Sequence, residues 1–313
     1  MGTKMIIDCD TGIDDAQAII MAVTHDNIDV KAVTCVNGNA SIDNVCRNTL
    51  RVLHTCQKSQ VPVYKGCITS LTGEVLMAQH VHGGDGLGDV KHFPEIDMTN
   101  LQKEHASLAI IRLTNQYPGE ITMVAMGPLT NLAVAIRIDP DVSSRIKRLF
   151  IMGGNIEGKG NTSPAAEFNF RVDPEAACIV LNEFRCPITI IPWEACLSAG
   201  FTWDWVEQKW INTDTPKGNF IRDITATIRN FYKNDMRRSL YTSCDAVAMA
   251  VAIDYSVATD TQDVYATVEL AGTYTKGQMI CDWRKKLGKP PNVCVVLKYH
   301  HEKVQDLLKG MLM

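Results

Sequence analysis

The sequence lacks an excess of either charge and lacks any long apolar run. Its 313 residues carry 31 Lys and Arg against 35 Asp and Glu, a net charge of −4, so no basic surface is expected to attract nucleic acid or an anionic membrane. No stretch approaches the ~18 consecutive apolar residues of a membrane-spanning helix. Aromatic residues make up only 7% and prolines number only 12, yet 46% of residues are apolar. That composition excludes collagen-like and disordered chains.

The chain also lacks a Cys-x-x-Cys pair and an apolar secretory segment at its start. A charged residue occurs by position 8 in MGTKMIIDCD, which is not the pattern of a signal peptide. The 11 cysteines are an odd number at irregular spacings, a usage typical of reduced, buried thiols in a cytosolic protein. The sequence therefore predicts a cytoplasmic location.

Short β-branched runs alternate with helical patterns along the first part of the chain. Strands are expected at 4–9, 30–36, 61–64, 121–125, 148–152 and 188–191, and helices at 14–25, 42–57, 106–116, 129–138 and 174–182. This alternation predicts a mostly parallel sheet flanked by helices.

The second part of the chain has a different pattern. Residues 217–255 are expected to be largely helical, 264–270, 278–281 and 293–299 to be strands, and 300–312 to form a closing helix. Because no Gly/Ser linker separates the two parts, we expect one doubly wound α/β domain over residues 1–313. We expect this domain to contain helical insertions and a small group of strands near its C-terminus.

Four carboxylates lie within eight residues directly after the first expected strand: Asp8, Asp10, Asp14 and Asp15. Open parallel sheets bind ligands at the carboxyl ends of their strands, so this segment is a candidate site. Crowded carboxylates repel one another. A divalent cation relieves that repulsion, and ligands that are all oxygen favour Ca²⁺ or Mg²⁺ over zinc. The alternative is an acidic turn that only stabilises the start of the next helix.

Other motifs fit these residues poorly. An EF-hand loop needs oxygen ligands at alternating positions, which Gly12 and Ile13 interrupt. The GGDGLG stretch at 83–88 lacks the glycine spacing of a dinucleotide site, and no strand precedes it. An aspartyl phosphotransferase of the haloacid dehalogenase type also begins with a strand and Asp-x-Asp. Such an enzyme has Thr or Val two residues after the second Asp, where this chain has Gly12.

Several motifs together resemble the nucleoside hydrolases of the inosine-uridine preferring type, which cleave the N-glycosidic bond of ribonucleosides. The first is DCDTGIDDA at 8–16, and the others span nearly the whole chain. In order they are 36–39 (VNGN), 82–83 (HG), 85–88 (DGLG), 127–131 (GPLTN), 152–154 (MGG), Asn161, 167–170 (EFNF), 173–176 (DPEA) and Asp245. The resemblance implies an enzyme that releases ribose and a free purine or pyrimidine base, assembled as a homodimer or homotetramer.

The resemblance also implies a Ca²⁺ site held by the side chains of Asp10, Asp15 and Asp245 and by the Met126 carbonyl. Three hard carboxylates and a carbonyl suit this ion and leave room for water and ribose hydroxyls. A bound cation makes water easier to deprotonate, and by the same resemblance Asp10 is the general base.

The resemblance assigns further residues to the substrate. Those expected to bind ribose hydroxyls are Asp14, Asn161, Glu167 and Asn169. Asn39 would help to orient sugar and water, although a plain turn residue is the alternative. Phe168 belongs to the same substrate segment and is expected to face the core while its two neighbours face the ligand. Asn161 alone would also suit an ordinary flexible loop.

The side of the site that would meet the base departs from the family pattern. Many members have His directly before the last metal-ligand Asp, where it can protonate the leaving base, but this chain has Cys244. A thiol is a weak hydrogen-bond donor, so His82 is the remaining candidate, with a packing role as its alternative. Tyr232 and Arg237 lie on the expected helix before Asp245 and are candidates for contact with the base, with a solvated or packing role as the alternative.

The residues on the base side leave alternatives open for the preferred base and for the activity. Purine-specific members stack the base between paired tryptophans. Trp193 follows a strand here, but position 82 is His, so the preferred base is undetermined. The Cys244 departure also leaves a second hypothesis, a ribonucleoside- or ribose-binding protein that keeps the metal site but has little turnover.

Overall fold

The computed structural model describes residues 2–313, and its core is a sheet of nine strands in the order β10-β13-β7-β6-β5-β1-β2-β3-β4. All neighbouring pairs are parallel except β10 and β13. The strands are β1 (Thr3–Cys9), β2 (Ile28–Cys35), β3 (Val63–Lys65), β4 (Leu101–Gln102), β5 (Ile121–Ala125), β6 (Ile146–Met152), β7 (Ile188–Ile191), β10 (Ala258–Val264) and β13 (Val293–Tyr299). The predicted mostly parallel α/β fold is confirmed.

Side chains of the central strands enter two apolar clusters, one on each face of the sheet. In β1, Met5 and Ile7 belong to one cluster and Ile6 to the other, which is the period of two that a strand imposes. Because both faces are covered, these strands are continuous apolar runs rather than alternating patterns.

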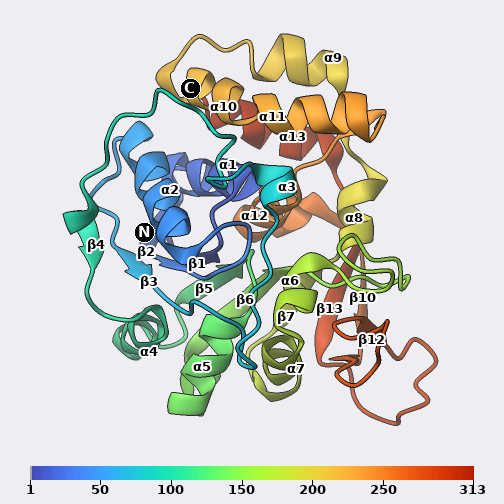
Figure 1. Ribbon diagram of the computed structural model, residues 1–313. Helices are drawn as coiled ribbons and strands as arrows, with labels where there is room; N and C mark the ends of the chain where they lie inside the picture. Colours follow the sequence, from blue (N-terminus) through green and yellow to red (C-terminus); the bar gives the residue numbers. More distant parts are fainter. Residues whose placement is uncertain (1) are drawn as a thin grey trace.

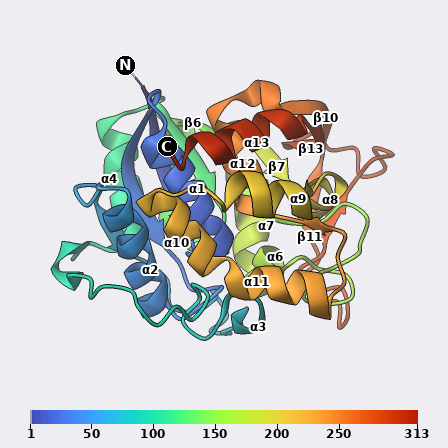
Figure 2. The ribbon, with the colours of Figure 1, turned by 90° about the horizontal axis from the view of Figure 1, so that it is seen from above.

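Helices cover both faces of the sheet (Figures 1 and 2). The first cluster includes residues of α1 (Ile13–Thr24), α2 (Ile42–Thr55), α12 (Cys244–Ile253) and α13 (His301–Gly310). The second includes residues of α4 (Ala106–Gln116), α5 (Thr130–Ile138) and α7 (Pro174–Glu183). The sheet is therefore the middle of three layers.

Shorter elements fill the connections. Two small antiparallel pairs are β8 (Phe201–Thr202) with β9 (Leu240–Tyr241) and β11 (Ala266–Val268) with β12 (Met279–Cys281). The short helices are α3 (Gln79–His82), α6 (Phe168–Val172), α8 (Trp193–Ser198), α9 (Trp203–Trp205), α10 (Pro216–Ile224) and α11 (Ala226–Asn230), and π-helical turns cover Val206–Trp210 and Phe231–Asp235. No helix within residues 2–313 is both long enough and apolar enough to cross a membrane.

One segment of the second half differs from the prediction. The expected strand at 264–270 is the end of β10 followed by the short β11. Most of β10 is polar and exposed at the edge of the sheet, so no apolar run marks it. Residues 217–255 are largely helical, as predicted, but in separate pieces. The helical stretch ends after Asp235, and Arg237 has a left-handed φ of 50°, before β9 and α12 follow.

The strand order reverses between β1 and β5. From β1 the chain continues to β2, β3 and β4 on one side, whereas β5, β6 and β7 lie on the other side (Figure 1). In open α/β sheets, the crevice for ligands forms at the carboxyl ends of the strands at such a reversal. Asp10 directly follows β1 and Met126 directly follows β5, so the fold brings the acidic segment to this position.

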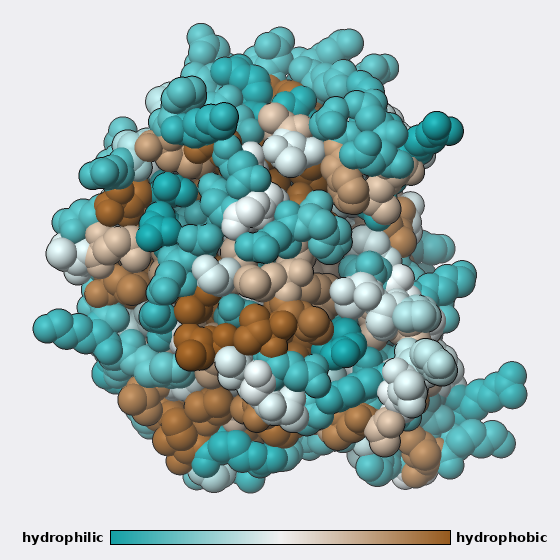
Figure 3. All heavy atoms as spheres, viewed as in Figure 1, coloured by the Kyte–Doolittle hydropathy of each residue, from teal (hydrophilic) through white to brown (hydrophobic). Residues whose placement is uncertain are grey.

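One surface segment is unusually apolar. Between β3 and α3, the side chains of Ile68, Leu71, Val75 and Met77 are exposed, from 40% for Leu71 and Met77 to 58% for Ile68. The segment crosses the face seen in Figure 1, and Figure 3 shows apolar patches on this otherwise largely hydrophilic face. An exposed apolar surface of this kind is typical of a site of contact with another protein chain.

Candidate active site

Asp10 is fixed in the turn that follows β1. The backbone N–H of Asn39 donates to its Oδ2 at 2.7 Å, while its Oδ1 is buried and has no hydrogen-bond partner among the described residues. The backbones of Gly38 and Gly127 pack closely against the carboxylate: an added Cβ would lie 2.0 and 3.0 Å from its oxygens. The carboxylate therefore has little freedom to rotate.

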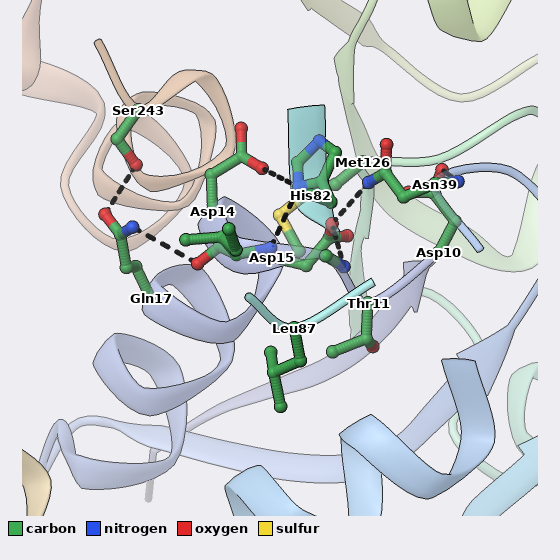
Figure 4. A network of polar contacts seen from close by, with 12 residues as sticks. Asp10, Thr11, Asp14, Asp15, Gln17, Asn39, His82, Leu87, Met126 and Ser243 are labelled. Atoms are coloured by element: carbon green, nitrogen blue, oxygen red, sulfur yellow. Dashed lines mark hydrogen bonds and ion pairs between the residues drawn. The ribbon is translucent and has the colours of Figure 1, made fainter. Parts of the chain in front are cut away.

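Asp15 lies on the first turn of α1, and Asn39 joins it to Asp10 (Figure 4). Its Oδ2 accepts hydrogen bonds from the Gly12 N–H at 2.9 Å and from Asn39 Nδ2 at 3.1 Å. Its Oδ1, like that of Asp10, is buried without a partner in the part of the chain described. Asn39 is thus a bridge between two carboxylates, and not a simple turn residue.

Carboxylate oxygens of Asp14, Asp15 and Asp245 all lie within 4.8 Å of one another. Two of the three predicted side-chain ligands are in this group, but Asp14 is in it and Asp10 is not. Asp14 and Asp15 share the first turn of α1, which packs against α12 and its Asp245. Asp10 stays beside the group because Asn39 and the two glycines hold it.

The electrostatics of these groups suit a hard cation. Burial, followed by repulsion from neighbouring carboxylates, raises the pKa of Asp10 and of Asp245 well above the usual range and raises that of Asp15 to about 7. The carbonyl of Met126 accepts from Asn169 Nδ2 at 2.7 Å and keeps a second lone pair. Unpartnered buried oxygens among repelling carboxylates are the arrangement that Ca²⁺ or Mg²⁺ relieves, so the residues fit the predicted ion.

A buried hydrogen-bond network that the sequence did not reveal joins α1 to the segment before α12 (Figure 4). Ser243 Oγ donates to Gln17 Oε1 at 2.7 Å, and Gln17 Nε2 donates to the Tyr241 hydroxyl at 2.9 Å. Gln17 follows Asp15 by two residues and Ser243 precedes Asp245 by two. The network therefore connects the two helix ends that carry the three converging carboxylates.

His82 packs over the start of α1. The backbone N–H of Ile13 donates to its Nδ1 at 3.1 Å, so the proton of the neutral ring is on Nε2. Asp14 Oδ1 lies 4.0 Å from the same Nδ1. Burial lowers the pKa of His82, and the nearby Asp14 charge only partly opposes this. His82 is therefore a neutral imidazole that can offer one N–H to the pocket.

A pocket opens beside these carboxylates, and Asp14 and Asp245 line it. Asp10 and Asp15 are not part of its lining. The predicted residues in its wall are Asp14, Asn39, His82, Met126, Asn161, Glu167, Phe168, Asn169, Tyr232, Cys244 and Asp245. Trp193, Phe231 and Arg238 also contribute, so one end of the pocket is aromatic.

Glu167, Phe168 and Asn169 form the start of α6. Both Glu167 oxygens accept backbone N–H groups, from Gly154, Asn169 and Phe170, yet burial raises its pKa to about 7. The side-chain nitrogen of Asn169 donates to the carbonyls of Met126 and Met152, so its oxygen is the atom left for a ligand. The expectation that Phe168 faces the core is wrong: Phe168 lines the pocket, and Phe170 is the buried core residue.

Arg237 lies outside the pocket, and its neighbour Arg238 lines it instead. Arg237 is exposed and has a φ of 50°. The preceding π-helical turn at Phe231–Asp235 is wider than an α-helical turn and shifts which residues share a face. Arg237 therefore follows the end of this helical stretch instead of lying on a helix, as was predicted.

Cys244 is 7% exposed and lines the pocket beside Asp245. A hydrogen bond with Cys196, followed by burial, raises the pKa of its thiol well above the usual value. The group at the position of the expected leaving-group acid is thus a protonated thiol, a weak donor.

Comparison with known proteins agrees with the fold. A sequence profile described as inosine-uridine preferring nucleoside hydrolase matches residues 5–306. An inosine-uridine preferring nucleoside hydrolase of Crithidia fasciculata is 34% identical and covers 100% of this chain and 98% of its own. A pyrimidine-specific ribonucleoside hydrolase, RihA, of Salmonella arizonae is 35% identical, with coverage of 100% and 99%.

The solved structure of a plant nucleoside hydrolase superposes with a TM-score of 0.92 at 31% identity, covering 100% of this chain and 99% of the plant one. The profile match runs from β1 to α13 and so includes every element that contributes to the pocket. The chain belongs to the inosine-uridine preferring nucleoside hydrolase family and is a ribonucleoside hydrolase.

Proposed function

We propose that this protein is a calcium-dependent hydrolase that cleaves the N-glycosidic bond of ribonucleosides and releases ribose and a free purine or pyrimidine base. The observation that carries the proposal is the carboxylate group below the pocket. Asp14, Asp15 and Asp245 converge there, and Asp10 and Asp15 each keep a buried oxygen without a partner among the described residues. Oxygen ligands alone favour Ca²⁺ or Mg²⁺.

The ion would be held by Asp15, Asp245 and the Met126 carbonyl, with Asp10 or Asp14 completing the set. When bound, it would make a nearby water easier to deprotonate. Asp10 is the proposed general base because the Asn39 N–H and two glycine backbones hold its carboxylate at the edge of this group. Burial and the neighbouring carboxylates raise the pKa of Asp10 above that of an ordinary aspartate, so its carboxylate is a stronger proton acceptor than an exposed one.

Asp14, Asn161, Glu167 and Asn169 are the proposed partners of the ribose hydroxyls. Glu167 and the free oxygen of Asn169 accept hydrogen bonds, and a buried carboxylate also stabilises the positive charge that develops on the sugar. Sites built to pair with a hydroxyl reject analogues that lack it by ~10⁴-fold or more. We therefore expect ribonucleosides to be hydrolysed at least ~10⁴-fold faster than 2′-deoxyribonucleosides, measured as kcat/KM, and comparable rates would contradict these assignments.

On the base side, Phe168 and Tyr232 offer aromatic surfaces, and His82 offers its Nε2–H as a hydrogen-bond donor. The Cys244 thiol contributes little proton transfer. General acid catalysis is typically worth ~10²–10⁴-fold, so the site needs another way to help the base depart.

A substrate panel tests the proposal. The protein is incubated with inosine, uridine, adenosine and a phosphate ester, after chelation and after addition of Ca²⁺ or Mg²⁺, and reducing sugar and phosphate are assayed. We expect reducing sugar only, restored best by Ca²⁺, and loss of at least ~10²-fold in Asp10→Asn with folding retained. Full activity in the chelated protein would contradict metal dependence. Phosphate release would indicate the phosphotransferase, and binding without turnover the ribonucleoside-binding protein.

The same domain, residues 1–313, is proposed to carry the whole activity, in the cytoplasm and as a homodimer or homotetramer. The exposed apolar segment between β3 and α3, with Ile68 and Val75, supports a buried contact between copies. Light scattering after gel filtration measures the assembly state. Fractionation of the source cells measures the location.

A further inference from the structure

Arg238 is the only lysine or arginine among the described residues that line the pocket. Its guanidinium carbon lies 4.4 Å from the centre of the Tyr232 ring and 5.7 Å from that of Trp193. Both rings line the same pocket. A cation over aromatic faces is attracted by their π electrons, so the planar group is held at the aromatic end of the pocket.

Hydrogen bonds fix both the backbone and the side chain of Arg238. Its N–H donates to the Tyr232 carbonyl at 2.8 Å, and its own carbonyl accepts from Trp203 Nε1 at 2.9 Å. Its Nη1 donates to Thr242 Oγ1 at 3.2 Å. No carboxylate in residues 2–313 forms an ion pair with it, although exposed arginines such as Arg137 and Arg185 do form such pairs. Donors of a half-buried cation therefore remain for a ligand.

The proposed reaction needs a positive group at this end of the pocket. When the bond between C1′ and the base nitrogen breaks, its electron pair moves to the base. Two polar groups that line the pocket, the Cys244 thiol and the neutral His82 imidazole, are weak proton donors. His80 and Tyr232 line it as well. A fixed cation that faces the developing negative charge lowers the barrier without transferring a proton.

We propose that Arg238 stabilises the departing base by donating hydrogen bonds from its guanidinium to an acceptor atom of the base as the C–N bond breaks. This inference rests on the proposed hydrolase function. The attacking water adds its oxygen to C1′ and gives one proton to Asp10, and the bond pair leaves with the base. The base then takes a proton from solvent water, and Asp10 returns its proton to the hydroxide so formed. One water is consumed overall, and Arg238 stays charged throughout because a guanidinium does not deprotonate in proteins.

The decisive variants are Arg238→Gln and Arg237→Gln. They remove the same charge from adjacent positions, of which the structure places only position 238 in the pocket. Each is assayed on inosine, on uridine and on a nitrophenyl riboside, whose aryl group leaves without needing stabilisation. We expect R238Q to lower kcat on inosine and uridine by ~10²–10³-fold, as removal of one preorganised donor does, with much less effect on the aryl riboside. R237Q should leave all three rates unchanged.

Two further readouts separate this role from a structural one. Arg238→Lys keeps the charge but loses the planar fork, so it should recover part of the rate on inosine. The ratio of wild-type to R238Q rates on inosine should stay constant between about pH 6 and 9, because the guanidinium does not titrate there. If R238Q does not fold, Arg238→Met, whose unbranched chain can still pack on Tyr232, takes its place in the same assays.

An equal loss on natural and aryl substrates in R238Q, or a loss matched by R237Q, would overturn the role of Arg238 while leaving the hydrolase function intact. A wild-type protein that cleaves none of the three substrates in Ca²⁺ would instead refute the proposed function. The two failures are therefore distinguishable.

Discussion

Asp10 owes its orientation to backbone groups rather than to charged partners. The Asn39 N–H holds one carboxylate oxygen, and Gly38 and Gly127 approach so closely that neither position has space for a side chain. Close contact with backbone fixes a side chain at little cost in entropy, because the backbone is already ordered by the strand ends. Glycine at these positions is thus part of the site.

A methyl group at position 38 should disable the enzyme. In Gly38→Ala the new Cβ would lie 2.0 Å from Asp10 Oδ2, so the carboxylate must move. A displacement of about 1 Å in a catalytic group can cost ~10²-fold in rate, and we expect kcat on inosine to fall by at least that factor. The matched control is Gly310→Ala, where the added Cβ meets open space. Wild-type kcat in G38A would show that the position of Asp10 tolerates such a shift.

Glu167 links the stability of a short helix to pH. It caps α6 by accepting the N–H groups of Asn169 and Phe170, and it also accepts that of Gly154. Burial raises its pKa from the usual 4.5 to about 7. Between these values the folded protein holds a proton that the unfolded chain has lost. The stabilisation is therefore complete below pH 4.5 and is lost as the pH rises to about 7.

Replacement of Glu167 by Gln should remove this contribution to the pH dependence. The variant is expected to be less stable overall, because an amide cannot accept all three N–H groups. The stability advantage of the wild type should shrink as the pH rises from 4.5 to 7. Urea denaturation of chelated protein at several pH values measures it, with exposed Glu95→Gln as control. A difference that is constant with pH would contradict the assignment.

Gln17 connects α1 to the segment before α12. Its loss should make the positions of the Asp15 and Asp245 carboxylates relative to each other less fixed. Gln17→Met keeps the shape but leaves Ser243 Oγ and the Tyr241 hydroxyl without their partner. Each unsatisfied buried polar group costs about 1–3 kcal/mol, so a stability loss of that order is expected together with weaker Ca²⁺ binding. Calorimetric titration and urea denaturation measure the two effects. Exposed Gln60→Met is the control, and unchanged Ca²⁺ affinity in Q17M would limit the network to folding.

The elements that the sequence predicted are those with strong local patterns. Buried strands such as β5 are uninterrupted apolar runs, and α2 repeats its apolar residues at helical spacing. The edge strand β10 and the short helices α3 and α6 were missed, because an exposed strand needs no apolar residues and four or five residues cannot display a helical period. The π-helical turn before Arg237 was also not predicted, because no amino-acid composition distinguishes such a turn from an α-helical one.

For the whole molecule, strand ends predict only part of the site, whereas Glu167, Asn169 and Asp245, at α6 and α12, were predicted from the motifs of the family resemblance. Asp10 and Met126 follow β1 and β5, and the reversal of strand order brings them together. Gln17, Ser243 and Arg238 could not be assigned, because their roles depend on how α1, β9 and α12 pack, which no local pattern specifies. Tertiary packing likewise decides that Asp14, and not Asp10, lies with Asp15 and Asp245.

The buried carboxylates should make the ion-free protein less stable than it could be. Neutralising one of them relieves repulsion, so Asp15→Asn is expected to melt at a higher temperature than the wild type in chelator. Its amide can also donate to Asp245, since the two side chains already interact. Ca²⁺ at 100 times its Kd stabilises the wild type by about 2.7 kcal/mol, a gain that D15N should largely lose.

The order of the two melting temperatures should therefore reverse between chelator and saturating Ca²⁺. Exposed Asp26→Asn should follow the wild type in both conditions, because it changes the net charge equally without touching the carboxylate group. If D15N gained as much stability from Ca²⁺ as the wild type, Asp15 would not be a ligand. If D15N were less stable in chelator, the hydrogen bonds that Asp15 accepts from Gly12 and Asn39 would outweigh the repulsion among the carboxylates.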